Sequence, residues 1–133
     1  MGGTWRCVIV ATAQDAAKLF EPIFAEAPGE AETLAVAYLD RDRRLIELMV
    51  SPSESAEHVD LPVRRILEDG LRLGAAGIIV AHNHPSGDAQ PSREDIEATR
   101  ELADTSSRLG MRLHDHLIFA GSERCSLRSM GLL

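Results

Sequence analysis

A short apolar run, Ala75 to Ala81, most constrains the fold, because it lies between an expected helix and two histidines. Upstream, from Leu61 to Leu73, apolar residues recur at helical spacing, and Gly74 is suited to end that helix. The run is short, apolar and flanked by this helix, so we expect a buried strand. Because another strand is expected before the helix, the order strand, helix, strand predicts a crossover connection.

Two histidines follow this run at the spacing of an extended chain. His82 and His84 are separated by one residue, and positions i and i+2 of an extended segment point to the same side. Their imidazoles can therefore approach one point while Asn83 faces away. A carboxylate, Asp95, follows across a turn rich in Pro and Gly. Two imidazoles and one carboxylate suit zinc, and three protein ligands leave its fourth tetrahedral position open to water, which indicates chemistry rather than scaffolding.

Asp95 also has an interpretation as part of a helix start. Ser92 is suited to be an N-cap, and Asp95 then stands at N3, near the positive end of the helix dipole. The residues alone favour neither the capping role nor the ligand role. The two roles are compatible, since a residue in the first helical turn is held rigidly where a metal ion can use it.

The remaining elements alternate between strands and helices. A nearly all-apolar run from Leu34 to Leu39 predicts a strand covered on both faces, and a polar turn joins it to a second strand, Leu45 to Val50, as a hairpin. Together the elements predict an α/β domain with helices packed on a mixed sheet. The others are a strand at Trp5–Val10, a helix from Thr12 toward Phe20 that Pro22 interrupts or restarts, a loop over residues 51–60, a helix marked by Ile96 to Leu109 and closed by Gly110, and strands at Met111–Ala120 and Arg124–Leu127.

The composition is that of one ordinary globular domain. The chain has 133 residues, of which 44% are hydrophobic and 26% charged. The net charge of −7 disfavours a surface devoted to nucleic acid, because non-specific affinity comes mainly from clustered Lys and Arg. Arginines do gather around residues 41–44 and at 64–65, but acidic residues are interleaved around them. We therefore interpret both groups as solvated faces.

Cysteine usage and hydropathy favour a cytoplasmic protein. Cys7 and Cys125 are too few and too far apart for a disulfide framework or a Cys-rich zinc site, so we expect reduced thiols. No apolar run approaches the roughly 20 residues of a membrane span, and the N-terminus lacks the layout of a signal peptide. Both observations predict a cytoplasmic location.

The residues around the histidine pair resemble a known family. His-x-His-Pro followed by Ser-x-x-Asp is similar to the JAMM motif of the MPN+ metalloprotease clan, and residues 82–95, HNHPSGDAQPSRED, resemble its bacterial RadC branch. Similar strings at residues 32–40, 115–118 and 126–128 extend the likeness over nearly the whole chain. It implies a single RadC-like MPN domain over residues 1–133, with a core of about 30–133 and an N-terminal strand and helix extension at 1–29. It also implies layering like that of cytidine deaminases.

The resemblance implies a zinc-dependent hydrolase that attacks an amide or isopeptide bond in a peptide or protein substrate. His82, His84 and Asp95 would bind the metal ion. Glu32 matches the JAMM glutamate, which stands just before the apolar run, takes a proton from the attacking water and hands it to the leaving amine. Ser92 matches the JAMM serine, whose hydroxyl helps to stabilise the oxyanion.

Other functions stay open at this stage. The RadC name is historically tied to DNA repair, and His-Asn-His is similar to HNH nucleases. Those nucleases place a later Asn or His on a helix, and residues 95–110 contain neither. A metal-free MPN scaffold is disfavoured because all the expected ligand types are present. One departure from RadC proteins is the stretch Pro62-Val63-Arg64-Arg65, which stands where they usually have His-Pro-Arg-Glu.

A second group of polar residues, His114, Asp115 and His116, also invites a metal-site interpretation. In a regularly alternating strand His114 and His116 would share a face. The pair Asp115-His116 resembles a family position that is not counted among the ligands, so we favour a structural role or one that orients a ligand. His58 lies in a polar stretch and is interpreted as solvated.

Overall fold

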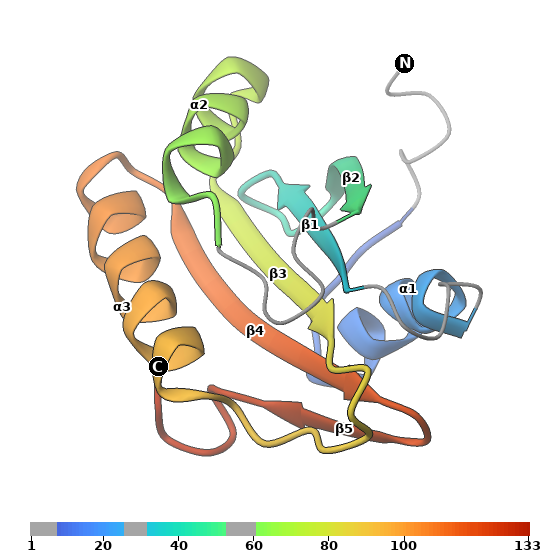
Figure 1. Ribbon diagram of the computed structural model, residues 1–133. Coiled ribbons are helices and arrows are strands. Elements are labelled where there is room, and N and C mark those ends of the chain that lie inside the picture. The colour runs from blue at the N-terminus through green and yellow to red at the C-terminus, as the bar shows by residue number, and fades with distance from the viewer. Residues whose placement is uncertain (1–7, 26–31, 53–60) are drawn as a thin grey trace.

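The computed structural model describes residues 8–25, 32–52 and 61–133. Its centre is a five-stranded mixed sheet in the order β2-β1-β3-β4-β5. Helix α1 packs on one face, and α2 and α3 pack on the other (Figure 1), which is the predicted α/β architecture. In chain order the elements are α1 (Ala13–Ala25), β1 (Thr33–Leu39), β2 (Leu45–Pro52), α2 (Val63–Leu73), β3 (Gly77–Asn83), α3 (Arg93–Arg108), β4 (Arg112–Ala120) and β5 (Glu123–Ser126).

Strand β1 confirms the prediction of a strand covered on both faces, because all its residues are buried. Its alternate side chains belong to two different cores. Ala35, Ala37 and Leu39 pack with Phe20 of α1, whereas Leu34, Val36 and Tyr38 pack with Ile66 of α2 and Leu102 of α3. The predicted hairpin with β2 is also present, as an antiparallel pair.

Two crossover connections determine where the ends of the strands meet. Strands β2 and β3 both pair antiparallel with β1, so they run parallel to each other, with α2 between them in sequence. Strands β3 and β4 are parallel neighbours connected by α3. Residues 84–92 lead from the carboxyl end of β3 to the start of α3, so a side chain in the first turn of α3 can approach a side chain at that end of the strand.

Strand β4 contains an irregularity that changes which of its side chains face α3. Its register with β3 shifts between Ile78 and Ile79, because Ile78 pairs with Leu113 whereas Ile79 pairs with Asp115. This β-bulge at His114 interrupts the strict alternation of side chains. In a regular strand His114 and His116 would lie on the same face, whereas here their surroundings differ. His114 packs against Gly77, whereas His116 contacts His82.

Helix α1 is the clearest departure from the predicted elements. Pro22 does not interrupt it, since the helix continues to Ala25. Pro22 is exposed, so the carbonyl that it leaves without a helical donor can bond to water. Beyond it, the Phe24 ring stacks on Phe119 with their centroids 4.8 Å apart. This packing favours continuing the helix despite the proline.

Other boundaries differ slightly from the predicted ones. Strand β3 extends to Asn83, so His82 lies within the strand rather than after it. Of the N-terminal strand expected at Trp5–Val10, residues 5–7 lie outside the described residues, and Ile9 forms an isolated antiparallel bridge with Arg44. Cys7, His58 and most of the expected loop at 51–60 also lie outside them, whereas Ser51 and Pro52 end β2.

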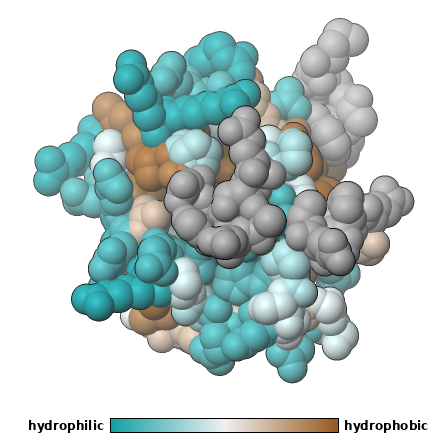
Figure 2. All heavy atoms as spheres, viewed as in Figure 1, coloured by the Kyte–Doolittle hydropathy of each residue, from teal (hydrophilic) through white to brown (hydrophobic). Residues whose placement is uncertain are grey.

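Helices α2 and α3 carry exposed charged side chains. Figure 2 shows hydrophilic residues over much of the outer sides of α2 and α3. The exposed Arg64 agrees with the interpretation of the arginines at 64–65 as a solvated face. Charged pairs at helical spacing lie on both helices: Arg64–Glu68, Arg93–Glu97 and Arg108–Asp104. Among the described helices, none has the length and apolar character to cross a membrane.

Candidate metal centre

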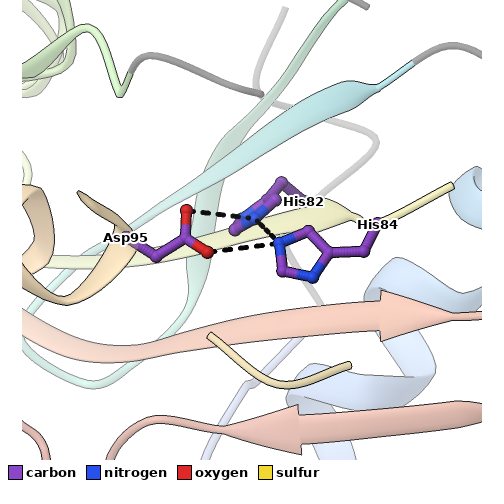
Figure 3. A group of neighbouring side chains, drawn as sticks. All are labelled: His82, His84 and Asp95. Carbon is purple, nitrogen blue, oxygen red and sulfur yellow. Dashed lines mark hydrogen bonds and ion pairs between the residues drawn. The ribbon is translucent and has the colours of Figure 1, made fainter. Parts of the chain in front are cut away.

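Three polar side chains converge at the carboxyl end of β3. His82 lies in the strand, His84 follows its last residue, and Asp95 comes from the first turn of α3 (Figure 3). The His82 Nε2 and His84 Nε2 atoms are 3.0 Å apart. Asp95 Oδ2 lies 3.2 Å from His84 Nε2, and Asp95 Oδ1 lies 3.5 Å from His82 Nε2. Within the described parts of the chain, this is the group of His, Cys, Asp and Glu side chains that can hold a metal ion.

These separations match what one tetrahedral ion requires. Ligand atoms about 2.0–2.1 Å from a zinc ion at tetrahedral angles lie about 3.3 Å from one another. The distances of 3.0, 3.2 and 3.5 Å, which join the two imidazole nitrogens to each other and each of them to one oxygen of the Asp95 carboxylate, lie around that value. The donor types, two imidazole nitrogens and a carboxylate oxygen, also suit zinc. The residues present therefore fit a metal ion in both distance and chemistry.

Asp95 is held in place by the start of its own helix. The Ser92 hydroxyl accepts a hydrogen bond from the Asp95 N–H, and Asp95 Oδ2 accepts one from the Ser92 N–H, which completes a capping box. Oδ2 is the same oxygen that lies near His84. Asp95 thus caps the helix and lies in the candidate metal centre at the same time, and the sequence had indicated that these two positions are compatible.

Each histidine uses its second nitrogen to hold the ring. His84 Nδ1 lies 2.9 Å from the Asp88 carbonyl oxygen, which can only accept, so this nitrogen carries the proton. His82 Nδ1 lies 2.7 Å from His116 Nε2. Protonated outer nitrogens leave both Nε2 lone pairs directed at the centre, as metal-binding histidines require.

The electrostatics of the group favour a charged carboxylate. Burial alone would raise the pKa of Asp95, but its contacts with the His82 and His84 imidazoles and the hydrogen bond from the Ser92 N–H hold it below its ordinary value. The hydrogen bond with Asp95 is the main reason that the pKa of His84 is raised. Burial lowers the pKa of His116 to about 3, so this imidazole is neutral at ordinary pH.

Glu32 is brought to the same end of the sheet. It precedes β1, whose Leu34 pairs with His82, and the Thr33 N–H donates to the Asn83 side chain at 2.6 Å. The Glu32 side chain is only 4% exposed, and its charge contributes to the raised pKa of His84. A buried carboxylate therefore lies close enough to act electrostatically on the histidine pair.

Reasoning from the sequence did not identify Thr99. Its hydroxyl lies 2.6 Å from His116 Nδ1 and donates to the Asp95 carbonyl oxygen at 2.5 Å. The only signal available was its position one turn after Asp95 on the same helix face. Asp115 has a different role, because its carboxylate accepts from Ser126 and from the Arg128 N–H and so attaches the C-terminal segment to β4.

A cavity of about 560 Å³ lies beside the centre. His84 and Asn83 form part of its wall, so it adjoins one member of the triad. Its other walls are partly apolar and partly charged, and they include Phe24, Phe119, Pro85, Glu21 and Arg124. Glu21 and Arg124 form an ion pair of 2.8 Å between α1 and β5.

The mixed sheet and the converging His, His and Asp side chains define an α/β domain with a candidate metal centre. A profile of the RadC-like JAB domain family matches residues 10–132. The chain belongs to this family, which confirms the resemblance seen in its motif.

Three relatives of the chain are UPF0758 proteins. It is 39% identical to a UPF0758 protein of Ruegeria pomeroyi over 104 residues, which cover 78% of this chain and 46% of that protein. It is 37% identical to a UPF0758 protein of Rhodobacter capsulatus over 102 residues, 77% of this chain and 48% of that protein. A UPF0758 protein of Salinibacter ruber is 36% identical over 120 residues, 90% of this chain and 50% of that protein. The chain spans about half the length of these relatives.

Proposed function

We propose that this domain is a zinc-dependent hydrolase that cleaves an amide or isopeptide bond in a peptide or protein. The observation that carries the proposal is the convergence of two imidazole nitrogens and one carboxylate at tetrahedral separations. The buried Glu32 carboxylate beside His84 adds a candidate general base. A purely structural site would use a fourth protein ligand and would have no need of that carboxylate.

The chain's own residues divide the work. His82, His84 and Asp95 would hold the ion, which when bound lowers the pKa of a water to about 7 and polarises a carbonyl oxygen. Glu32 would accept the proton of the attacking water and return it to the leaving amine. The Ser92 hydroxyl uses a lone pair to cap α3, so its proton can be donated to the developing oxyanion.

The neighbouring cavity supports a peptide or protein substrate. Its volume of about 560 Å³ can accept a side chain next to the scissile bond. The stacked Phe24 and Phe119 rings provide an apolar surface there, while the Glu21–Arg124 ion pair provides polar groups. An extended peptide passing His84 would place one residue in this cavity.

The test compares zinc content and hydrolysis in matched variants. Wild-type protein is expected to bind about one zinc per chain. It is also expected to cleave some members of a library of peptides and isopeptides whose fluorescence is quenched until they are cleaved. Removal of zinc by a chelator should abolish cleavage, and added zinc should restore it. Glu32→Gln should keep the zinc and lose at least about 100-fold in rate, because general acid and base catalysis contributes that much.

The control is Glu97→Gln, which changes an exposed carboxylate on α3. It should keep both zinc and activity. A wild-type protein that binds no zinc, or a Glu32→Gln protein that cleaves as fast as wild type, would refute the proposal. Cleavage of DNA under the same conditions would instead favour a nuclease.

A further inference from the structure

We propose that His116 and Thr99 are positioning residues that fix the tautomer and ring orientation of His82, through a hydrogen-bond chain ending on the backbone carbonyl of Asp95. The inference deepens the proposed function, because it assumes that His82, His84 and Asp95 form a metal-binding group. It does not depend on hydrolysis or on the identity of the substrate.

The chain of contacts is continuous and buried. His82 Nδ1 lies 2.7 Å from His116 Nε2, and His116 Nδ1 lies 2.6 Å from the Thr99 hydroxyl oxygen. That hydroxyl lies 2.5 Å from the Asp95 carbonyl oxygen. His82 and His116 are each 2% exposed, and Thr99 is fully buried. Water therefore has little access to replace any of these partners.

The direction of every hydrogen bond follows from the last one. The Asp95 carbonyl oxygen can only accept, so the Thr99 hydroxyl donates its single proton there. The Thr99 oxygen must then accept from His116, which places the His116 proton on Nδ1 and leaves a lone pair on Nε2. That lone pair accepts from His82 Nδ1–H. A neutral His82 is left with its own lone pair on Nε2, the atom that faces His84 and Asp95.

The arrangement couples two of the three candidate ligands. Asp95 supplies a carboxylate oxygen to the centre and also the backbone carbonyl that orders the chain to His82. Movement of the first turns of α3 would disturb both at once. Thr99 lies four residues after Asp95, one helical turn away, so the helix itself holds the carbonyl and the hydroxyl together.

The β-bulge at His114 makes the chain possible. Leu113 packs in the core with α2 and α3, so in a regular strand Asp115 and not His116 would face the same side. The bulge shifts this alternation by one residue and lets His116 face His82 and Thr99. This local irregularity in β4 therefore brings His116 into contact with a member of the candidate metal centre.

The experiment uses paired substitutions and Co²⁺ as a spectroscopic probe in place of zinc. Thr99→Val keeps the side-chain volume and removes the hydroxyl, whereas Thr99→Ser keeps it. Thr99→Val should lower Co²⁺ affinity about 10-fold to 100-fold, as loss of an outer partner does, and should change the visible absorption of the bound Co²⁺. Thr99→Ser should restore both. His116→Phe should resemble Thr99→Val.

The matched control is Ser106→Ala, which removes another buried hydroxyl from α3. Ser106 donates only to the Ala103 carbonyl of its own helix, at 3.2 Å. This variant should keep wild-type Co²⁺ affinity and absorption. If Thr99→Val binds Co²⁺ with unchanged affinity and spectrum, or if Ser106→Ala weakens binding as much, the proposal is overturned.

A measurement on metal-free wild-type protein keeps the proposal testable if a variant fails to fold. Imidazole ¹⁵N chemical shifts at neutral pH should show His82 protonated on Nδ1 and bare on Nε2, and His116 the same. A proton on His82 Nε2 would overturn the inference. Co²⁺ binding without any hydrolysis would refute the proposed function and leave this inference standing, so the two failures are distinguishable.

Discussion

Helices α2 and α3 occupy equivalent places in the fold but bury different kinds of side chain. Each forms a crossover between parallel strands, and both pack on the same face of the sheet. The buried residues of α2 are Ile66, Leu67 and Gly70. Those of α3 include the polar residues Asp95, Thr99 and Ser106 alongside Leu102. A buried polar side chain costs free energy unless it is hydrogen-bonded, so the difference needs a reason.

The two helix starts differ in the same way. Pro62 at the N-cap of α2 makes no side-chain capping bond, whereas Ser92 and Asp95 of α3 form a capping box. The first turn of α3 is therefore held more tightly, and that turn carries the carboxylate of the candidate metal centre. Helix α2 therefore contributes packing, whereas α3 contributes packing and a precisely held group of polar atoms.

Asp95→Ala tests the α3 side of this comparison and should have the largest effect. Loss of a direct ligand should weaken zinc binding by on the order of 1,000-fold, more than the 10-fold to 100-fold expected for an outer partner. Zinc affinity is measured by competition with a chromogenic chelator. Asp104→Ala is the control, because Asp104 is an exposed carboxylate on the same helix. Equal weakening by both substitutions would contradict the assignment of Asp95 to the centre.

Ile66→Ala tests the α2 side. Ile66 is 2% exposed, so its truncation should lower the free energy of unfolding by about 3 kcal/mol through lost burial and a residual cavity. Denaturant unfolding measures this loss, and zinc affinity of the folded protein should stay at the wild-type value. Leu71→Ala, at a position on α2 that is 54% exposed, should cost much less. A large loss of zinc affinity in folded Ile66→Ala would show that α2 also shapes the centre.

His114 lies where both crossovers lead back into the sheet, and it should make the fold sensitive to acid. Burial, together with the charges of Arg43, Arg112 and Arg128, lowers its pKa from 6.5 to about 4. Between these values the unfolded chain binds a proton that the folded chain does not, so stability is greatest above pH 6.5 and falls toward pH 4.

His114→Asn removes this titration. Its unfolding free energy should therefore decline less than that of wild type between pH 6.5 and about 4, by about 1–2 kcal/mol after allowance for partial exposure. Denaturant unfolding at several pH values measures the difference between the two slopes. Parallel slopes in this window would show that His114 does not contribute. The loss of stability in acid would then come from groups at the other end of the strands, where the candidate metal centre lies.

The contrast between α2 and α3 also explains which features could be predicted from the sequence. The spacing of His82 and His84, and the match of Ser92 and Asp95 to a helix start, are local patterns. Crossover topology then brings the carboxyl end of β3 next to the first turn of α3. Local pattern and simple topology together indicated this convergence, although the residues alone left the ligand role of Asp95 open beside its capping role.

Features that depend on distant packing were not predictable. Pro22 forbids an ideal helix locally, yet α1 continues because Phe24 stacks on a ring of β4. The bulge at His114 depends on the register of two strands and has no signature in the alternation of residues. Thr99 becomes meaningful only once that bulge turns His116 toward it. Each of these required contacts between residues far apart in the chain.

Ser92→Ala should have the smallest effect on stability and sharpens the comparison of the helix starts. Removing the hydroxyl that accepts from the Asp95 N–H should cost about 1 kcal/mol of unfolding free energy, whereas Ser92→Gly should cost only a few tenths. Ser92→Thr keeps the cap and serves as the control. Denaturant unfolding gives the cost. Since α2 folds without any side-chain cap, an unchanged zinc affinity in Ser92→Ala would mean that packing alone holds Asp95, whereas a weakened affinity would mean that the capping box positions the carboxylate.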